Sequence, residues 1–283
     1  MLDKQFYTLQ QLAVVLSGSS ETPVLDCRFF LAEILQVTLG EILYGVSLCP
    51  RQYMRLQLMM QRRCQGEPVA YILGYTEFWG LRLRVMPGVL IPRSDTECLV
   101  EQVLQDYGKE SLRGLDLGTG SAAISLALAS ERSNWSFDAI ESSEVAVRCA
   151  RHNCAMHSNI VSQVNIWHAS WINMPGALLK QSYNFIVANP PYIAPGCTAV
   201  MESVRRFEPE EALFAQDDGL AALREIIALA PQYLLTNGAL YLEHGYQQAA
   251  LVRDLLHNAG FFSIRTQQDF SGYDRVSMGI YPL

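Results

Sequence analysis

The chain has 283 residues, of which 50% are hydrophobic and 17% are charged, and its formal net charge is −7. This length accommodates one full α/β domain and a smaller second domain. An acidic chain does not hold nucleic acid mainly through the phosphates, so we expect no direct nucleic-acid partner.

The seven cysteines are scattered without a C-x-x-C pair, which is typical of free thiols in a reducing compartment. Cys149, His152, Cys154 and His157 lie close together, but they fall within a predicted helix and match no common zinc spacing. No uncharged apolar run approaches the length that crosses a bilayer, and the first residues lack the basic start of a secretory signal. We therefore expect a cytoplasmic protein with no metal site and no membrane association.

The first 65 or so residues are predicted to be helical. Thr22 resembles an N-cap with Pro23 at the first helical position, and apolar residues recur at helical spacing from Leu25 onward. A further helix is predicted around residues 54–59 and ends at Gly66-Glu67-Pro68.

The pattern changes to alternation between residues 78 and 91. Leu81, Leu83 and Val85 share one face of this segment, and Pro87-Gly88 supplies a turn. The sequence therefore predicts a β-hairpin that links two domains.

From residue 94 the pattern becomes a strand–helix alternation. Ser94-Asp95-Thr96-Glu97 is predicted to be a capping box at the start of a helix. Predicted strands cover residues 112–117, 137–141, 185–188 and 238–243, predicted helices cover 124–129, 144–157 and 220–234, and two further segments, 261–265 and 276–280, could pair antiparallel at an edge. This alternation predicts an α/β fold with a mostly parallel sheet covered by helices on both faces.

A glycine loop lies between the first strand of this region and the helix that follows. Gly118, Thr119 and Gly120 form the loop, where missing side chains let the backbone approach a ligand closely. Glu141 ends the next strand, where its carboxylate can accept both hydroxyls of a ribose. The alternative is a tight turn beside a solvated carboxylate.

Two classes of cofactor compete for this loop. A dinucleotide favours a third glycine three residues after Gly120, where this chain has Ala123. The preceding Asp116 would repel a pyrophosphate but would attract the ammonium of a methionine tail. The charge therefore favours S-adenosyl-L-methionine over NAD.

A buried-type strand leads directly into Asn189-Pro190-Pro191-Tyr192. The two prolines lack backbone donors and fix φ, so the strand must stop there and hold Asn189 stiffly at its carboxyl end. The Asn189 side-chain oxygen and the Pro190 carbonyl can accept both protons of a planar amide or amine nitrogen, and Tyr192 can stack on the planar group. Proximity and alignment then supply much of the rate of methyl transfer without a strong base. The alternative is a proline-stiffened turn.

Residues from about 66 to the end resemble the protein-(glutamine-N5) methyltransferases that modify peptide chain release factors, the HemK/PrmC family. The stretches that carry the resemblance are Gly66-Glu67-Pro68-Val69-Ala70-Tyr71, Phe78-Trp79, residues 90–97, residues 116–120, Asn189-Pro190-Pro191-Tyr192, Arg206-Phe207-Glu208-Pro209, Glu243-His244-Gly245 and Arg275-Val276. The tetrapeptide is shared with nucleic-acid methyltransferases, whereas the segments at 90–97 and 206–209 are far more particular to this family.

The resemblance implies a class I S-adenosylmethionine-dependent methyltransferase, which is Rossmann-like with a seven-stranded, mostly parallel sheet. It divides the chain into a helical substrate-recognition domain at 1–74, a β-hairpin linker at 75–93 and a methyltransferase domain at 94–283. The implied reaction is methylation of the glutamine side-chain nitrogen in the Gly-Gly-Gln motif of release factors, and we expect a monomer with those factors as partners.

The resemblance also assigns the site. The implied cofactor residues are Asp116, Gly118, Thr119, Gly120, Glu141, Trp171 and Asn189, the substrate residues are Asn189, Pro190, Pro191 and Tyr192, and the catalytic residues are Asn189, Pro190 and Tyr192. The chain departs from the family at Ala122, where glycine is usual, and at Ser170, where an acid commonly precedes the tryptophan.

Other functions remain open at this point. A glutamine methyltransferase of a ribosomal protein would use the same tetrapeptide. An adenine-N6 DNA methyltransferase is disfavoured by the acidic charge and by the absence of a recognisable target-recognition domain. A cofactor-binding protein with weakened catalysis would be consistent with the departures at Ala122 and Ser170.

Overall fold

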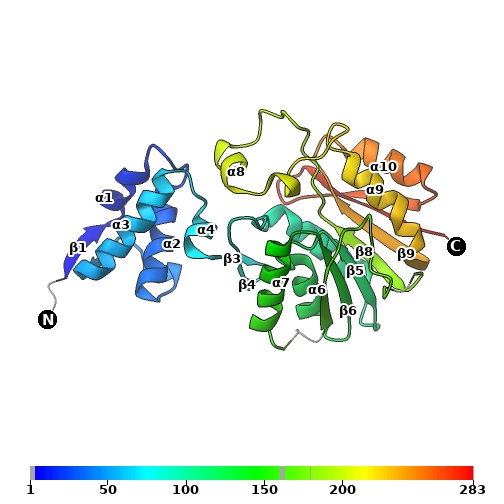
Figure 1. Cartoon of the computed structure of the whole chain (residues 1–283). Coiled ribbons are helices and arrows are strands. Elements are labelled where there is room, and N and C mark those ends of the chain that lie inside the picture. The colour runs from blue at the N-terminus through cyan, green and yellow to red at the C-terminus, as the bar shows by residue number, and fades with distance from the viewer. Residues whose placement is uncertain (1–3, 160–162, 179, 283) are drawn as a thin grey trace. The chain divides into compact units, whose positions relative to one another are not determined.

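The computed structural model describes residues 4–159, 163–178 and 180–282, and the chain divides into two compact units (Figure 1). The first unit contains the residues up to Tyr75 together with Met201–Phe207, and the second contains Thr76–Val200 and the residues from Glu208 onward. The three-part division predicted from the sequence, with boundaries at 74 and 93, stays a prediction. Within the described residues, no helix has the length and apolar character needed to cross a membrane.

The first unit is mainly helical, as predicted. Its helices are α1 (Leu9–Ala13), α2 (Pro23–Leu35), α3 (Pro50–Cys64), α4 (Val69–Leu73) and α8 (Glu202–Phe207), and its strands are β1 (Gln5–Thr8) and β2 (Gly45–Leu48). The sequence patterns missed the antiparallel β1–β2 pair, because four-residue strands are too short to show a period. This pair depends on Gly45, since a Cβ there would lie 2.2 Å from the Tyr7 carbonyl oxygen.

The start of α2 is where the sequence predicts it, but the capping contact is different. Pro23 is the first residue of the helix, yet the Thr22 hydroxyl donates to Asp26 at 3.2 Å and caps no backbone group. Asp26 is buried and also forms an ion pair with Arg63 at 2.6 Å. The helix start is thus held by a buried carboxylate that links α2 to α3.

The buried face of α2 is offset from the apolar series that begins at Leu25. Leu25 is 40% exposed, whereas Phe30 and Leu31 are fully buried. The offset arises because α2 carries apolar residues on more than one side, and its contacts with α1, α3 and α4 determine which side is buried.

A β-hairpin joins the units in the sequence, but its turn is not where the sequence places it. β3 (Tyr75–Phe78) and β4 (Leu81–Arg84) pair through a turn at Trp79-Gly80, and Pro87-Gly88 forms a separate turn beyond the hairpin. Trp79 and Gly80 have φ of 52° and 69°, and a type I′ hairpin turn requires positive φ at both of its central residues. Tryptophan is not a typical turn residue, so the pattern pointed instead to the proline and glycine downstream.

The second unit contains a seven-stranded sheet in the order β10-β11-β9-β8-β5-β6-β7. The strands are β5 (Arg113–Leu117), β6 (Ser136–Glu141), β7 (Val164–His168), β8 (Tyr183–Ala188), β9 (Leu234–Glu243), β10 (Phe262–Gln268) and β11 (Asp274–Ile280). β5 to β9 run parallel to one another, and β11 pairs antiparallel with both β9 and β10. The predicted fold class is confirmed, including the antiparallel pair.

Two local predictions in this unit need correction, and two elements were missed. The capping box at residues 94–97 is wrong: Ser94–Thr96 form a 3-10 turn, η3, before α5 (Glu97–Asp106), and the Glu97 carboxylate accepts the Trp79 N–H at 2.8 Å. The predicted helix 220–234 is too long, because α9 (Ala221–Leu229) gives way to a short turn before β9. β7 and α10 (Ala249–Asn258) were not predicted.

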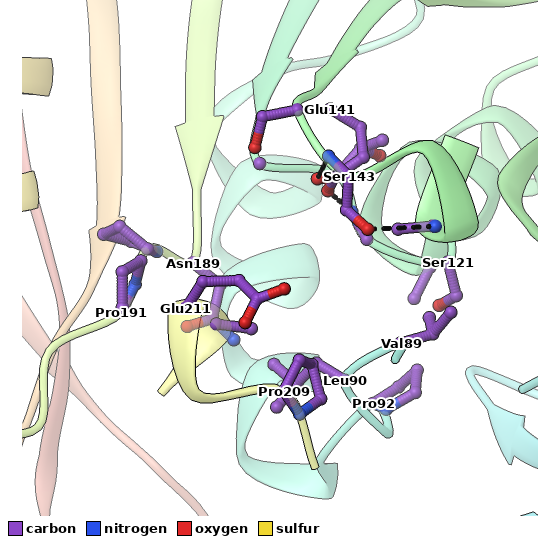
Figure 2. Close-up of a pocket in the computed structure, with 18 of the residues that line it drawn as sticks. Val89, Leu90, Pro92, Ser121, Glu141, Ser143, Asn189, Pro191, Pro209 and Glu211 are labelled. Atoms are coloured by element: carbon purple, nitrogen blue, oxygen red, sulfur yellow. Dashed lines mark hydrogen bonds between the residues drawn. The ribbon is translucent and has the colours of Figure 1, made fainter. Parts of the chain in front are cut away.

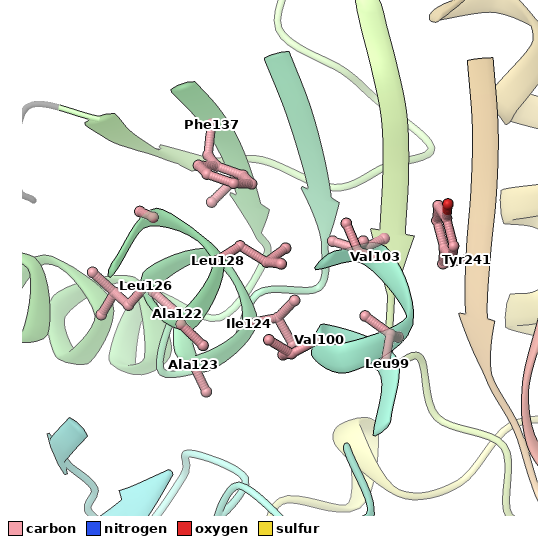
Figure 3. Close-up of a cluster of buried hydrophobic side chains, with 14 of the residues drawn as sticks. Leu99, Val100, Val103, Ala122, Ala123, Ile124, Leu126, Leu128, Phe137 and Tyr241 are labelled. Atoms are coloured by element: carbon pink, nitrogen blue, oxygen red, sulfur yellow. The ribbon is translucent and has the colours of Figure 1, made fainter. Parts of the chain in front are cut away.

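Helices cover both faces of the sheet (Figure 1). On one face α5, α6 (Ala123–Glu131) and α7 (Glu144–Met156) pack against Phe137 and Phe185 (Figure 3). On the other face α9 and α10 pack against Ile186 and Ala188. Successive side chains of β8 are therefore buried on opposite faces of the sheet, and this packing on both faces fixes the position and direction of the strand.

Gly114 in β5 lies between Phe137 of β6 and Phe185 of β8, its partners in the two neighbouring strands. A Cβ at this position would lie 2.7 Å from the Phe185 ring and 2.8 Å from the Phe137 ring. We predict that Gly114→Ala lowers the free energy of unfolding by about 1–3 kcal/mol, because close-packed rings must shift. Urea unfolding measures this change. Gly176→Ala is the matched control, since no atom lies within 4 Å of its Cβ position, and equal effects of the two substitutions would contradict the prediction.

Candidate active site

The carboxyl ends of three parallel strands meet at one edge of the sheet. Leu117 in β5 pairs with Ala188 in β8 on one side and with Ile140 in β6 on the other. The register therefore places Gly118, Glu141 and Asn189 beside a common pocket (Figure 2). Eight of the site residues that the sequence predicts line this pocket: Gly118, Thr119, Gly120, Glu141, Trp171, Asn189, Pro190 and Pro191.

The glycine loop presents bare backbone to this pocket. Gly118 and Gly120 have φ of 76° and 58°, and the N–H groups of Gly118 and Thr119 donate to the Ile140 carbonyl at 2.9 and 3.0 Å. A Cβ on Gly120 would meet no atom within 4 Å. The loop is therefore fixed to β6 from behind while open space is left in front of Gly120.

Glu141 is oriented by the backbone on both sides of it. Its Oε2 accepts the Gly120 N–H at 2.8 Å and its Oε1 accepts the Ser143 N–H at 2.8 Å. Each carboxylate oxygen can accept a further hydrogen bond through its remaining lone pair. The carboxylate is thus preoriented to bind two neighbouring hydroxyl groups.

Asp116 lies behind the glycine loop and does not line the pocket. Its Oδ2 accepts the hydroxyls of Thr119 and Ser125, each at 2.6 Å, while its Oδ1 has no hydrogen-bond partner among the described residues. Complete burial raises the pKa of this carboxyl to about 6. Asp116 therefore ties the loop to the start of α6, and its direct contact with a cofactor stays a prediction.

The two departures from the family pattern lie outside the pocket lining. Ala122 has a φ of 66° and is buried in the core under α6, so its methyl group points away from the pocket. The Ser170 hydroxyl accepts the N–H of Ile172 at 3.2 Å. Trp171 does line the pocket, and its ring lies 3.1 Å from the position that a Cβ of Gly118 would take.

The tetrapeptide after β8 divides between the pocket and the protein interior. Asn189, Pro190 and Pro191 line the pocket, and the Asn189 Nδ2 donates to the Thr96 hydroxyl at 3.1 Å. Tyr192 does not line it, and its hydroxyl donates to Glu243 at 3.1 Å. The structure therefore brings three of the four residues to the pocket, and the stacking role of Tyr192 stays a prediction.

The sequence patterns missed one wall of the pocket. Pro209 lies beside Leu90 in this wall (Figure 2). The wall is lined by two segments, Gly88, Val89, Leu90 and Pro92 on one side and Pro209, Glu211 and Ala212 on the other. Glu208 joins the two segments, because its carboxylate accepts the Ile91 N–H at 3.1 Å and pairs with Arg93 at 2.6 Å. Both segments carry the family resemblance, but nothing in their spacing predicted that they meet.

Two family models match the chain. The PrmC N-terminal domain covers residues 8–74, and the Methyltransferase small domain covers residues 94–207. The release factor glutamine methyltransferase of Coxiella burnetii is 41% identical, with 94% of each chain covered. The chain belongs to the release factor glutamine methyltransferase family.

A second member of this family shows similar agreement, and a solved structure shares the fold. The Escherichia coli K12 release factor glutamine methyltransferase is 40% identical over 93% of this chain and 94% of its own length. A solved methyltransferase from Pyrococcus furiosus matches with a TM-score of 0.53 at 16% identity, over 72% of this chain and 90% of that one, and this likeness shows the fold alone. This chain is therefore a methyltransferase, as the sequence predicted.

Gly120 offers a direct test of the glycine loop. We predict that Gly120→Ala weakens cofactor binding at least about ten-fold, because the new methyl group would occupy space that a ligand must approach. Isothermal titration with S-adenosyl-L-homocysteine measures the affinity. Gly272→Ala is the matched control, since Gly272 has a similar positive φ of 82° and open space at its Cβ position but does not line the pocket. Equal losses of affinity would contradict the assignment.

Two buried carboxyls predict how stability depends on pH. Burial raises the pKa of Asp116 from 3.8 to about 6 and that of Glu243 from 4.5 to about 7. The folded state then binds protons more tightly than the unfolded state, so these contributions are fully present below about pH 4 and are lost as pH rises through 6 to 7. Each loss amounts to about 3 kcal/mol.

We predict that Glu243→Gln reduces the fall in unfolding free energy between pH 5.5 and pH 8.5, as measured by urea denaturation. The substitution removes the group that must ionise inside the protein. Asp254→Asn on the exposed side of α10 serves as the control and should keep the wild-type slope. An unchanged slope in Glu243→Gln would show that burial does not perturb this carboxyl.

Proposed function

We propose that this chain transfers a methyl group from S-adenosyl-L-methionine to the side-chain amide nitrogen of the glutamine in the Gly-Gly-Gln motif of a peptide chain release factor. The observation that carries the proposal is the meeting of the glycine loop, Glu141 and Asn189-Pro190 at one pocket. The names of the curated relatives support the substrate. Such a substrate belongs to translation termination, and we place the reaction in the cytoplasm.

The cofactor side of the pocket fits S-adenosyl-L-methionine. The open space before Gly120 accommodates a close ligand, the free lone pairs of Glu141 suit the two ribose hydroxyls, and Trp171 offers an aromatic wall. Bound S-adenosyl-L-methionine supplies a methyl group on a positively charged sulfur.

The substrate side of the pocket fits a planar amide. The Asn189 Nδ2 already donates to Thr96, so its Oδ1 is left to accept one N–H of the glutamine side chain. The Pro190 carbonyl can accept the second N–H, which leaves the nitrogen lone pair free to face the methyl group. Fixed acceptors of this kind raise the rate by alignment and need no strong base.

The structure also bears on the alternative that this chain is a cofactor-binding protein with weakened catalysis. That reading rested on Ala122 and Ser170, and neither residue lines the pocket. A substitution outside the pocket removes no ligand contact, so both departures are compatible with an active enzyme. The ribosomal-protein glutamine remains the second candidate substrate, because it presents the same chemical group.

Methyl transfer from labelled S-adenosyl-L-methionine tests the proposal. Purified release factor, the same factor with its Gly-Gly-Gln glutamine replaced by alanine, ribosomal proteins and DNA are incubated separately with the chain. We expect label only on the release factor that keeps its Gly-Gly-Gln glutamine. Transfer to ribosomal protein or DNA without transfer to release factor would contradict the proposed substrate.

Asn189 provides a test of the proposed mechanism. We predict that Asn189→Ala lowers kcat by about 10²–10³-fold, the usual cost of removing one preoriented hydrogen-bonding group at a reacting centre. Cofactor affinity should stay within about two-fold, because the Ala variant keeps the glycine loop and Glu141. Asn258→Ala at the exposed end of α10 is the control and should retain wild-type kcat. A loss of cofactor affinity equal to the loss of kcat would reassign Asn189 to the cofactor.

A further inference from the structure

The orientation of the Asn189 amide decides whether the pocket can accept the substrate. An asparagine side chain has an oxygen that only accepts and an NH2 group that only donates. A glutamine amide nitrogen presents two protons, so it binds the oxygen and is repelled by the NH2 group. A rotation of the Asn189 amide by half a turn would therefore place a donor against a donor.

The contact that sets this orientation is with Thr96 at the end of η3. The Thr96 side chain is 4% exposed, and its Oγ1 accepts the Asn189 Nδ2–H at 3.1 Å. Thr96 occupies the N-cap position of α5 but caps no backbone group of the helix. Its hydroxyl therefore serves a contact other than helix capping.

A hydroxyl alone does not fix the orientation, because it can donate as well as accept. Glu243 at the end of β9 removes this freedom. Its side chain is 1% exposed, its Oε1 accepts the Tyr192 hydroxyl at 3.1 Å, and its buried Oε2 has no hydrogen-bond partner among the described residues. The nearby Thr96 hydroxyl lowers the pKa of this carboxyl and so partly offsets the rise caused by burial. Above the pKa of about 7, Glu243 is ionised and acts only as an acceptor.

The order of donors and acceptors then follows from Glu243. The buried Oε2 of Glu243 lacks a donor and attracts the Thr96 proton, while the Thr96 oxygen accepts the Asn189 Nδ2–H at 3.1 Å. These lone pairs can bind only the NH2 end of the amide. The Asn189 oxygen is left for the pocket.

We propose that Thr96 is a positioning residue of the methyl transfer, which with Glu243 holds the Asn189 amide with its oxygen toward the substrate. This inference rests on the proposed function, because it concerns the same pocket. It assigns to Thr96 and Glu243 a role in turnover and none in cofactor binding.

Steady-state kinetics at pH 8 with release factor as substrate tests the proposal. Thr96→Val keeps the shape of the side chain but removes the hydroxyl, and we expect kcat to fall at least about ten-fold while cofactor affinity changes less than about two-fold. Thr96→Ser restores the hydroxyl and should bring kcat back to within about three-fold of wild type. Thr236→Val, on β9 outside the pocket lining, controls for the substitution itself and should leave kcat unchanged.

A second arm asks whether Thr96 acts through Asn189. The double variant Thr96→Val with Asn189→Ala should be no slower than Asn189→Ala alone, because residues that act through one contact are not additive. Wild-type kcat in Thr96→Val, or a multiplicative further loss in the double variant, would overturn the proposal. If Thr96→Val no longer binds the cofactor, the Glu243→Gln variant tests the proposal instead. A lower kcat of Glu243→Gln with intact cofactor binding supports the proposal, and an unchanged kcat overturns it. A wild-type chain that methylates no substrate would instead contradict the proposed function.

Discussion

The site depends on one constraint, the parallel register of β6, β5 and β8. Leu117 lies between Ile140 and Ala188, so the residues that follow these strand ends share one edge of the sheet. The rings of Phe137 in β6 and Phe185 in β8 pack over β5 because Gly114 has no side chain there. A shift of one residue in any of the three strands would turn its strand-end side chain to the other face of the sheet. The packing of β5, β6 and β8 therefore determines where the residues of the pocket lie.

Two buried acids support the site from behind and illustrate a common arrangement. Asp116 holds the glycine loop through the hydroxyls of Thr119 and Ser125, and Glu243 holds the hydroxyl of Tyr192 beside the substrate side. Burial disfavours both charges, as their raised pKa values show. The two carboxylates therefore lower the stability of the fold at neutral pH. In exchange, each of them fixes the orientation of the hydroxyl groups that donate to it.

The sequence predicted the parts of the site that are encoded by adjacent residues. The glycine loop and the Asn189 tetrapeptide were found because strand, turn and ligand-binding groups follow one another in the chain. Thr96 was assigned to a capping box, because its actual partner, Asn189, is 93 residues away. The Glu208 contacts with Ile91 and Arg93 span 117 and 115 residues and were missed for the same reason. Hydrogen bonds between distant residues leave no periodic pattern, so only the folded chain reveals them.

A co-crystal structure with S-adenosyl-L-homocysteine and a glutamine peptide from a release factor would test the central claim most directly. We expect the glutamine nitrogen to lie about 3 Å from the Asn189 Oδ1 and from the Pro190 carbonyl oxygen. The Asn189 Nδ2 should still donate to Thr96 in that complex. A glutamine nitrogen bound elsewhere in the pocket, or an Asn189 amide turned with its NH2 group toward the substrate, would contradict the account.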